Sequence, residues 1–262
     1  DHPYGTQTVL GTQEHLKNPS ITNIKNYHKT YYVPNNIAIC LSGDFDPDEM
    51  VAVIEKHFGK MQPNENLPEL KLETKSVIET PQEKDVYGLD AEMLMMGWKY
   101  PGAGTADALT ASVVSYILYN GSAGLIDLNL NQQQKVLGAQ SEAYTRPDAG
   151  EFIIMANPKQ GQTLEDVRDL LLAEIAKIRN GEFDESLMTG TINNLRLSMM
   201  RQLEDNSNRA DMFVQSFING TDWADEVAAL DKMSEITKQD VMDWAGKYLA
   251  DNSYAIVYKR QG

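Results

Sequence analysis

The sequence predicts an α+β fold: a duplicated module of mainly antiparallel sheet with helices packed on one face, the first copy being truncated at its N-terminus. Three observations predict it. Segments near the two ends of the chain repeat one another, the long middle part mixes strand patterns with helix patterns, and hairpins outnumber single crossovers.

The repeat is found when the sequence is shifted on itself by 217 residues, which places residues 24–39 on residues 241–256 without a gap. Four positions then carry related side chains: Tyr27 and Trp244, Tyr31 and Tyr248, Asn35 and Asn252, Ile39 and Ile256. Both copies have the apolar spacing of a helical face, preceded by the N-cap residue Ser20 or Thr237. A turn follows, and then the strand-like run "IAICLSG" or "YAIVYKR". We expect each copy to fold as helix, turn and strand.

The first copy continues into a helix with the sequence "DPDEMVAVIEKHFG". Asp46 and Glu49 suit a capping box, and Pro47 suits the first helical position. We expect one face of this helix to be buried, formed by Met50, Val53, Ile54, His57 and Phe58. The single cysteine, Cys40, lies in the preceding apolar run, so we expect a buried, inert thiol and no internal disulfide.

The second copy can be followed upstream through a series of expected elements. Residues 62–82 contain three prolines and no glycine, which indicates an extended linker leading into a strand at 70–78. The expected elements after it are a strand at 92–99, a helix at 105–119 capped by Thr105, a helix at 122–133, and strands at 137–145 and 150–156. Two helices follow, one from the cap Thr163 to Gly181 and one opening at Asp184.

These elements predict three segments. Residues 1–61 are the C-terminal tail of a first module, residues 62–82 the linker, and residues 83–262 a second module. The second copy takes roughly 180 residues to reach the end of its repeated helix, turn and strand, whereas the first copy reaches the same point by residue 39. We therefore expect most of the first module to precede this sequence.

The charge balance limits the kinds of partner. Twenty-three basic residues stand against 38 acidic ones, giving a net charge of −15, which argues against nucleic acid or an anionic membrane. The acidic surface has two interpretations, simple solvation or a preference for basic peptides. No stretch has the length and apolarity of a membrane-spanning helix.

The stretch "GTQEH" is the one candidate for a metal site. In an H-x-x-E-H helix two imidazoles and a carboxylate share one face, but Gly11 stands where the first histidine belongs. Shifted by 217, Glu14 and His15 fall on Asp231 and Lys232, so we expect an exposed loop. The histidines are far apart: His2, His15, His28 and His57. The last two are expected to be half-buried packing residues, and neither a metal ligand nor a catalytic residue is predicted.

Several strings together resemble a known family: "HPYG" (2–5), "GTQE" (11–14), "YHKTYYVPNNIAICLSGDFDPDEM" (27–50) and "HFG" (57–59). They are similar to the closing part of the first module of the insulinase/pitrilysin family of inverzincin zinc metallopeptidases. Residues 70–262, with "NQQQKVLGAQSEAY", resemble the family's next module. The resemblance implies paired α+β modules closing around a peptide, with the zinc ligands ahead of Asp1, so that no cofactor belongs to this chain although zinc is expected in the parent protein.

The resemblance also implies a substrate-holding pair that this sequence lacks. Supportive later modules of the family carry an arginine and then a tyrosine after Leu-Gly. Here Asn131 or Gln132 stands at the arginine position and Ala139 at the tyrosine position. Neither amide supplies a permanent charge or a forked donor. The second module is therefore expected to be non-catalytic.

The resulting hypothesis is a non-catalytic fragment of a zinc metalloendopeptidase that completes its peptide-binding chamber and is inactive alone. The expected partners are a catalytic module of the same polypeptide or a homologous subunit, and a peptide substrate. The alternatives are part of an inactive paralogue that acts as a binding or assembly subunit, and an unrelated acidic α+β protein with an accidental repeat. An extracytoplasmic bacterial location is favoured by the family and the acidic balance, with a mitochondrial one as the alternative.

Overall fold

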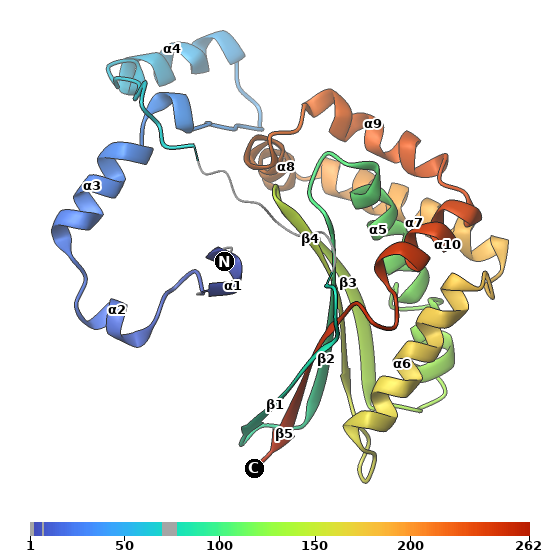
Figure 1. Ribbon diagram of the computed structural model, residues 1–262. Helices are drawn as coiled ribbons and strands as arrows, with labels where there is room; N and C mark the ends of the chain where they lie inside the picture. Colours follow the sequence, from blue (N-terminus) through green and yellow to red (C-terminus); the bar gives the residue numbers. More distant parts are fainter. Residues whose placement is uncertain (1–2, 7, 70–77) are drawn as a thin grey trace. The chain divides into compact units, whose positions relative to one another are not determined.

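Figure 1 shows the computed structural model of the chain, which describes residues 3–6, 8–69 and 78–262. Two compact units make up the fold. The first unit comprises Asp1–Thr74 with Leu203–Phe217, and the second unit comprises Lys75–Gln202 with Ile218–Gly262. Each is described by itself below. The division at residues 62–82 into two modules stays a prediction, because residues 70–77 of the expected linker and strand lie outside the described residues.

The second unit contains a five-stranded sheet in the order β1-β5-β2-β4-β3. Its strands are β1 (Gln82–Gly88), β2 (Met93–Pro101), β3 (Gly138–Thr145), β4 (Ala149–Asn157) and β5 (Ala255–Gln261). β1 and β5 run parallel, and every other neighbouring pair is antiparallel. The sheet is therefore mainly antiparallel, as predicted.

Helices cover one face of this sheet, and the hydrophobic core lies between the helices and the sheet (Figure 1). They are α5 (Ala106–Leu118), α6 (Leu164–Arg179) and α10 (Lys238–Tyr248), and all three contact β2. Alternate residues of β2 point into this layer and are buried: Leu94, Met96, Trp98 and Tyr100. The predicted α+β class with helices on one face is confirmed.

A threonine N-cap begins each of these three helices. Thr105, Thr163 and Thr237 each accept a hydrogen bond from the main-chain N–H three residues on. After α6 the chain turns at Gly181, whose φ of +70° lies in the left-handed region that favours glycine. Asp184 accepts from the N–H of Ser186 as α7 (Glu185–Glu204) begins. These predicted helix boundaries are confirmed.

A close approach between β2 and β4 requires glycine at position 150. A Cβ placed on Gly150 would lie 2.0 Å from Cε2 of Tyr100, so the tyrosine ring occupies the space of a side chain. The Tyr100 hydroxyl forms a hydrogen bond of 2.8 Å with Thr145 Oγ1. The register places Tyr100 opposite Gly150, which keeps the large ring inside the core.

Four elements between residues 70 and 234, taken from both units, differ from the expectations or lie outside the described residues. The helix expected at 122–133 is reduced to a π-helical turn, η2 (Asp127–Asn131), after two helical residues. Two helices, α8 (Asn206–Asn219) and α9 (Trp223–Ser234), were not among the predicted elements. The expected strand at 70–78 lies outside the described residues except for Ile78, which is not in a strand.

The first unit contains α1 (Pro3–Thr6), α2 (Gln13–Lys17), α3 (Ile21–Tyr31), the 3-10 turn η1 (Pro34–Asn36) and α4 (Pro47–Phe58). Ser20 caps α3, as predicted, by accepting from the N–H of Asn23. Asp46 caps α4 by accepting from the N–H groups of Asp48 and Glu49, and Pro47 occupies its first position. The helical half of the first repeat copy is therefore confirmed.

The packing expected for this unit is wrong in three respects. The run at 37–43 forms no strand among the described residues, because no described strand lies beside it and a strand needs a hydrogen-bonded neighbour. The expected stripe of α4 is not buried, and within residues 8–69 only Val33 is buried. Cys40 is half-buried rather than buried.

Candidate functional site

Asn131 closes η2 and binds the beginning of β3. Its Nδ2 donates to the carbonyl oxygen of Ala139 at 2.8 Å, and its Oδ1 accepts from the Ala139 N–H at 2.9 Å. A strand residue directs both of its main-chain groups to one side, so Ala139 faces Asn131 rather than β4. We call this pair of hydrogen bonds the Asn131 clip; it fixes one end of an edge strand.

Neighbouring side chains fix the loop that leads into η2. The buried carboxylate of Asp127 accepts from the N–H groups of Asn120 and Gly124, each at 3.0 Å. Gln132 Nε2 donates to the carbonyl oxygen of Ser122 at 2.8 Å. These contacts satisfy main-chain groups that the short helical turn leaves without partners.

Glu174 of α6 is buried and joins the same region. Its Oε2 accepts from Asn129 Nδ2 at 2.7 Å, and its Oε1 accepts from Lys177 Nζ at 2.7 Å. A carboxylate removed from water is stable only with such partners. Asp127, Asn129 and Glu174 were not among the residues predicted from the sequence. The signal for the first two was the alternation "DLNLN", in which polar residues are separated by leucines.

This geometry determines what the candidate positions can do. Asn131 and Ala139 are in direct contact, whereas the Gln132 side chain turns to Ser122. Both polar groups of the Asn131 amide are used by main-chain partners, and Ala139 is buried and carries no polar side-chain group. A guanidinium and a phenol at these places would offer a charge and a hydroxyl to a substrate. The side chains present offer neither.

The described part of the chain offers no group of side chains that could bind zinc. No three His, Cys, Asp or Glu side chains converge there. Glu14 and His15 are exposed as expected, but they lie in the short helix α2 rather than in a loop. His15 Nδ1 accepts from the N–H of Thr12 at 3.3 Å, so it serves a capping box. The expectation of half-buried His28 and His57 is wrong, since both are exposed, and His2 lies outside the described residues.

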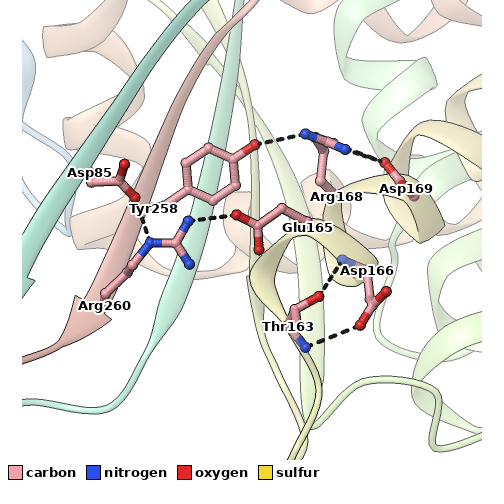
Figure 2. Close-up of polar contacts among 8 residues, drawn as sticks. All are labelled: Asp85, Thr163, Glu165, Asp166, Arg168, Asp169, Tyr258 and Arg260. Atoms are coloured by element: carbon pink, nitrogen blue, oxygen red, sulfur yellow. Dashed lines mark hydrogen bonds and ion pairs between the residues drawn. The ribbon is translucent and has the colours of Figure 1, made fainter.

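Arg260 on β5 is the centre of a polar cluster at the N-terminus of α6 (Figure 2). Its Nε contacts Asp85 of β1 at 2.5 Å, and its Nη2 contacts Glu165 of α6 at 2.6 Å. The hydrogen bond from Arg260 lowers the pKa of Glu165, because it favours the charged carboxylate. Arg260 thereby ties three elements together.

A second arginine fixes the same helix to the sheet. Arg168 donates to the Tyr258 hydroxyl at 3.1 Å and pairs with Asp169 at 2.8 Å (Figure 2). Burial raises the pKa of Tyr258, which therefore stays neutral and accepts this hydrogen bond. Arg168 and Arg260 therefore both bind side chains of the protein itself. The cluster joins α6 to β1 and β5 and does not present a free charge to a ligand.

The most strongly shifted tyrosine is also structural. Burial raises the pKa of Tyr100 to about 12, because the ionised phenolate would lose its hydration in the core. Its hydroxyl forms the hydrogen bond with Thr145.

No helix among residues 3–6, 8–69 and 78–262 combines the length and apolarity that a membrane crossing needs.

Comparisons with known proteins bear on the family and the fold of the chain. The chain is 24% identical over 271 residues to the zinc protease PqqE of Helicobacter pylori, an alignment that covers 98% of this chain and 58% of the relative. A crystal structure of a protease from Helicobacter pylori matches with a TM-score of 0.89 at 18% identity, covering 96% of this chain and 62% of that one. The chain thus spans about three fifths of the length of these relatives.

Two further comparisons bear on the type of module. The periplasmic protease PqqL of Escherichia coli matches with a TM-score of 0.72 at 14% identity, covering 96% of this chain and 29% of that one. The profile of the family described as "Peptidase M16 inactive domain" matches residues 20–195, more than half of the chain. The chain therefore belongs to the insulinase/pitrilysin (M16) peptidase family and contains its inactive domain.

Proposed function

We propose that the chain is a non-catalytic part of a zinc metalloendopeptidase and completes the chamber in which that enzyme binds a peptide. The Asn131 clip carries this proposal. At the positions where a supportive module would hold substrate, the side chains of Asn131 and Gln132 bind the chain's own main chain. The partner is a catalytic module of the same polypeptide or a homologous subunit, and it supplies the zinc that the relatives' names indicate.

The edge strand β3 suits an extended peptide. Alternation along the strand means that Ser141 and Ala143, like Ala139, direct their main-chain groups away from β4. The clip engages only Ala139, so the main chain beyond it can pair with an added strand. The net charge of −15 favours basic peptides in such a chamber. PqqL is a periplasmic protein by name, and an extracytoplasmic setting is proposed here as well.

The test measures zinc and peptide hydrolysis by the purified chain. We expect no stoichiometric zinc after dialysis and no cleavage of a fluorogenic basic peptide, because the described residues offer no ligand set. Zinc retained at one equivalent, with cleavage that a chelator abolishes, would contradict the proposal. The variant His15→Ala then shows whether "GTQEH" holds the metal.

The reading frame upstream of residue 1 separates this function from the alternative. An H-x-x-E-H motif encoded there supports the peptidase, whereas a homologous module without the motif supports an inactive binding or assembly subunit.

A further inference from the structure

The edge strand β3 presents three exposed side chains on one face. Gln140, Glu142 and Tyr144 alternate with residues that turn the other way, toward the helices. Ser141 shows this second direction, because its hydroxyl donates to the carbonyl oxygen of Ser115 on α5 at 3.1 Å. The three exposed side chains therefore lie on the face of the sheet that α5 does not cover.

A phenol and a carboxylate are joined on this face. The Tyr144 hydroxyl donates to Glu142 Oε2 at 2.5 Å. This hydrogen bond raises the pKa of Tyr144, because a carboxylate acceptor favours the neutral phenol. The contact fixes the direction of the carboxylate. Its second oxygen, Oε1, has no hydrogen-bond partner among the described residues.

A neighbouring carboxylate on the same face is already paired with a base. Glu151 of β4, opposite Tyr144 in the register, lies 2.6 Å from Arg146. Glu142 lies opposite Ile153 instead, and it forms no ion pair within the described parts of the chain. The charge of Glu142 is therefore available to a basic group from outside the chain.

The main chain around Glu142 determines where an added strand places its side chains. Ser141 and Ala143 direct their N–H and C=O groups away from β4, as the Asn131 clip shows for Ala139. An antiparallel strand that binds Ser141 and Ala143 leaves Glu142 in a non-hydrogen-bonded pair, in which the Cα atoms are about 4.5 Å apart and opposite side chains are closest. The opposite side chain of the added strand then lies beside the carboxylate, on the same face.

Charge decides between the possible occupants of this edge. A second copy of β3, paired antiparallel and centred on Glu142, would bring two carboxylates opposite each other, which is destabilising. Each copy also carries a net charge of −15. A lysine or arginine at the same place forms an opposite-charge pair, and Ile153 next to Glu142 offers apolar surface to its aliphatic part. The edge thus favours a basic peptide over a second copy of the chain.

We propose that Glu142 and Tyr144 form a subsite for one basic side chain of a peptide that adds to β3 as an antiparallel strand. Glu142 binds the ammonium or guanidinium group, and Tyr144 is a positioning residue that holds the carboxylate. The subsite selects extended segments with a lysine or arginine at the position opposite Glu142. This deepens the proposed function and rests on its placing of a peptide at β3.

The experiment measures binding of the full chain to two labelled peptides by fluorescence anisotropy. Both are short sequences of threonine, serine and valine around one central residue, which is arginine in the first and its uncharged isostere citrulline in the second. We expect the wild type to bind the arginine peptide about two- to fivefold more tightly, as an exposed opposite-charge pair does, and salt to reduce that preference. Glu142→Gln should abolish the preference, because the amide keeps the volume and loses the charge.

Two further variants separate the subsite from general effects. Glu185→Gln removes one charge from an exposed position on α7 and should keep the preference. Tyr144→Phe should reduce the preference when Glu142 is present and should change nothing more in the Glu142→Gln background, because the phenol acts through the carboxylate. A merely structural role of Tyr144 would instead weaken binding of both peptides equally in both backgrounds.

The outcomes separate the subsite from the proposed function. Equal affinity of the wild type for both peptides overturns the subsite, and so does a preference that Glu142→Gln leaves intact; in both cases peptide binding still supports the function. Slowed amide exchange at 141–145 in the complex supports the placing of the peptide at β3, and slowing confined to other residues overturns it. Binding of neither peptide contradicts the subsite and the peptide-binding function together.

Discussion

Asn131 is a single side chain that joins a helical turn to an edge strand. The amide of Asn131 directs both its nitrogen and its oxygen to the main chain of Ala139, and it carries no charge that could hold a substrate. The sequence predicted that neither Asn131 nor Gln132 could replace an arginine. It could not predict the clip, because the clip depends on a contact between a π-helical turn and a strand that only the folded chain brings together.

The clip has a measurable consequence for stability. Asn131→Ala leaves the Ala139 main-chain groups without these partners, so we expect the free energy of unfolding to fall by about 1–3 kcal/mol. Urea denaturation followed by circular dichroism measures the change. Gln133→Ala, an exposed neighbour, is the control and should stay within about 0.5 kcal/mol of the wild type. Equal losses in the two variants would show that the clip is not what holds β3.

At the scale of elements, the helix boundaries could be read from the sequence because their signals are local. Thr105, Thr163 and Thr237 each cap a helix through a partner three residues away. The strand run at 37–43 has the same kind of local pattern as β5 and yet forms no strand in the described chain. Strand formation depends on distant neighbours, and this explains why the prediction failed there.

The capping box of α10 makes that helix sensitive to acid. Asp240 Oδ2 accepts from Thr237 Oγ1 at 2.6 Å and from the Thr237 N–H at 2.8 Å, and the hydroxyl contact is the main cause that lowers the pKa of Asp240. Because the pKa is lower in the folded state, the stabilisation is present above the unfolded pKa of about 3.9 and is lost as pH falls through the folded value.

Denaturation followed over a series of pH values from about 6 downward tests this. We expect Asp240→Asn to be less stable than the wild type at about pH 6, and the difference to shrink as the pH falls through the lowered pKa of Asp240, where the wild-type carboxyl becomes protonated too. In the first repeat copy the corresponding position is Asn23, so α3 has no such dependence built in. A stability difference that stays constant as the pH falls would contradict the capping explanation.

For the whole molecule, the second unit holds the hydrophobic core. Every buried member of the core cluster lies between Leu94 and Tyr258. We therefore expect a fragment of residues 78–262 to unfold cooperatively at nearly the denaturant midpoint of the full chain. A fragment ending at residue 236 lacks the buried Trp244, Tyr248 and Ile256, and should not fold. A large drop in the midpoint of the first fragment would show that the core needs the N-terminal residues.

The fold class and the family could be recognised from sequence, because a repeat and a long motif string carry both. The missed features share a physical cause. α8 and α9, the short η2 in place of a longer helix, and the exposed faces of α3 and α4 all depend on what packs against them. Propensity and periodicity are properties of one segment. Whether a face of that segment is buried depends on the other parts of the protein that pack against it.

The inner position of β5 has a consequence for synthesis of the protein. Strand β5 separates β1 from β2, so within the described sheet β1 has no partner until residues 255–261 have been synthesised. Because the ribosome tunnel withholds the newest residues, this sheet closes only once residues 255–261 have left the tunnel. Until then β1 and the incomplete core stay open to chaperones, and we expect a chain that stops before Ala255 to aggregate.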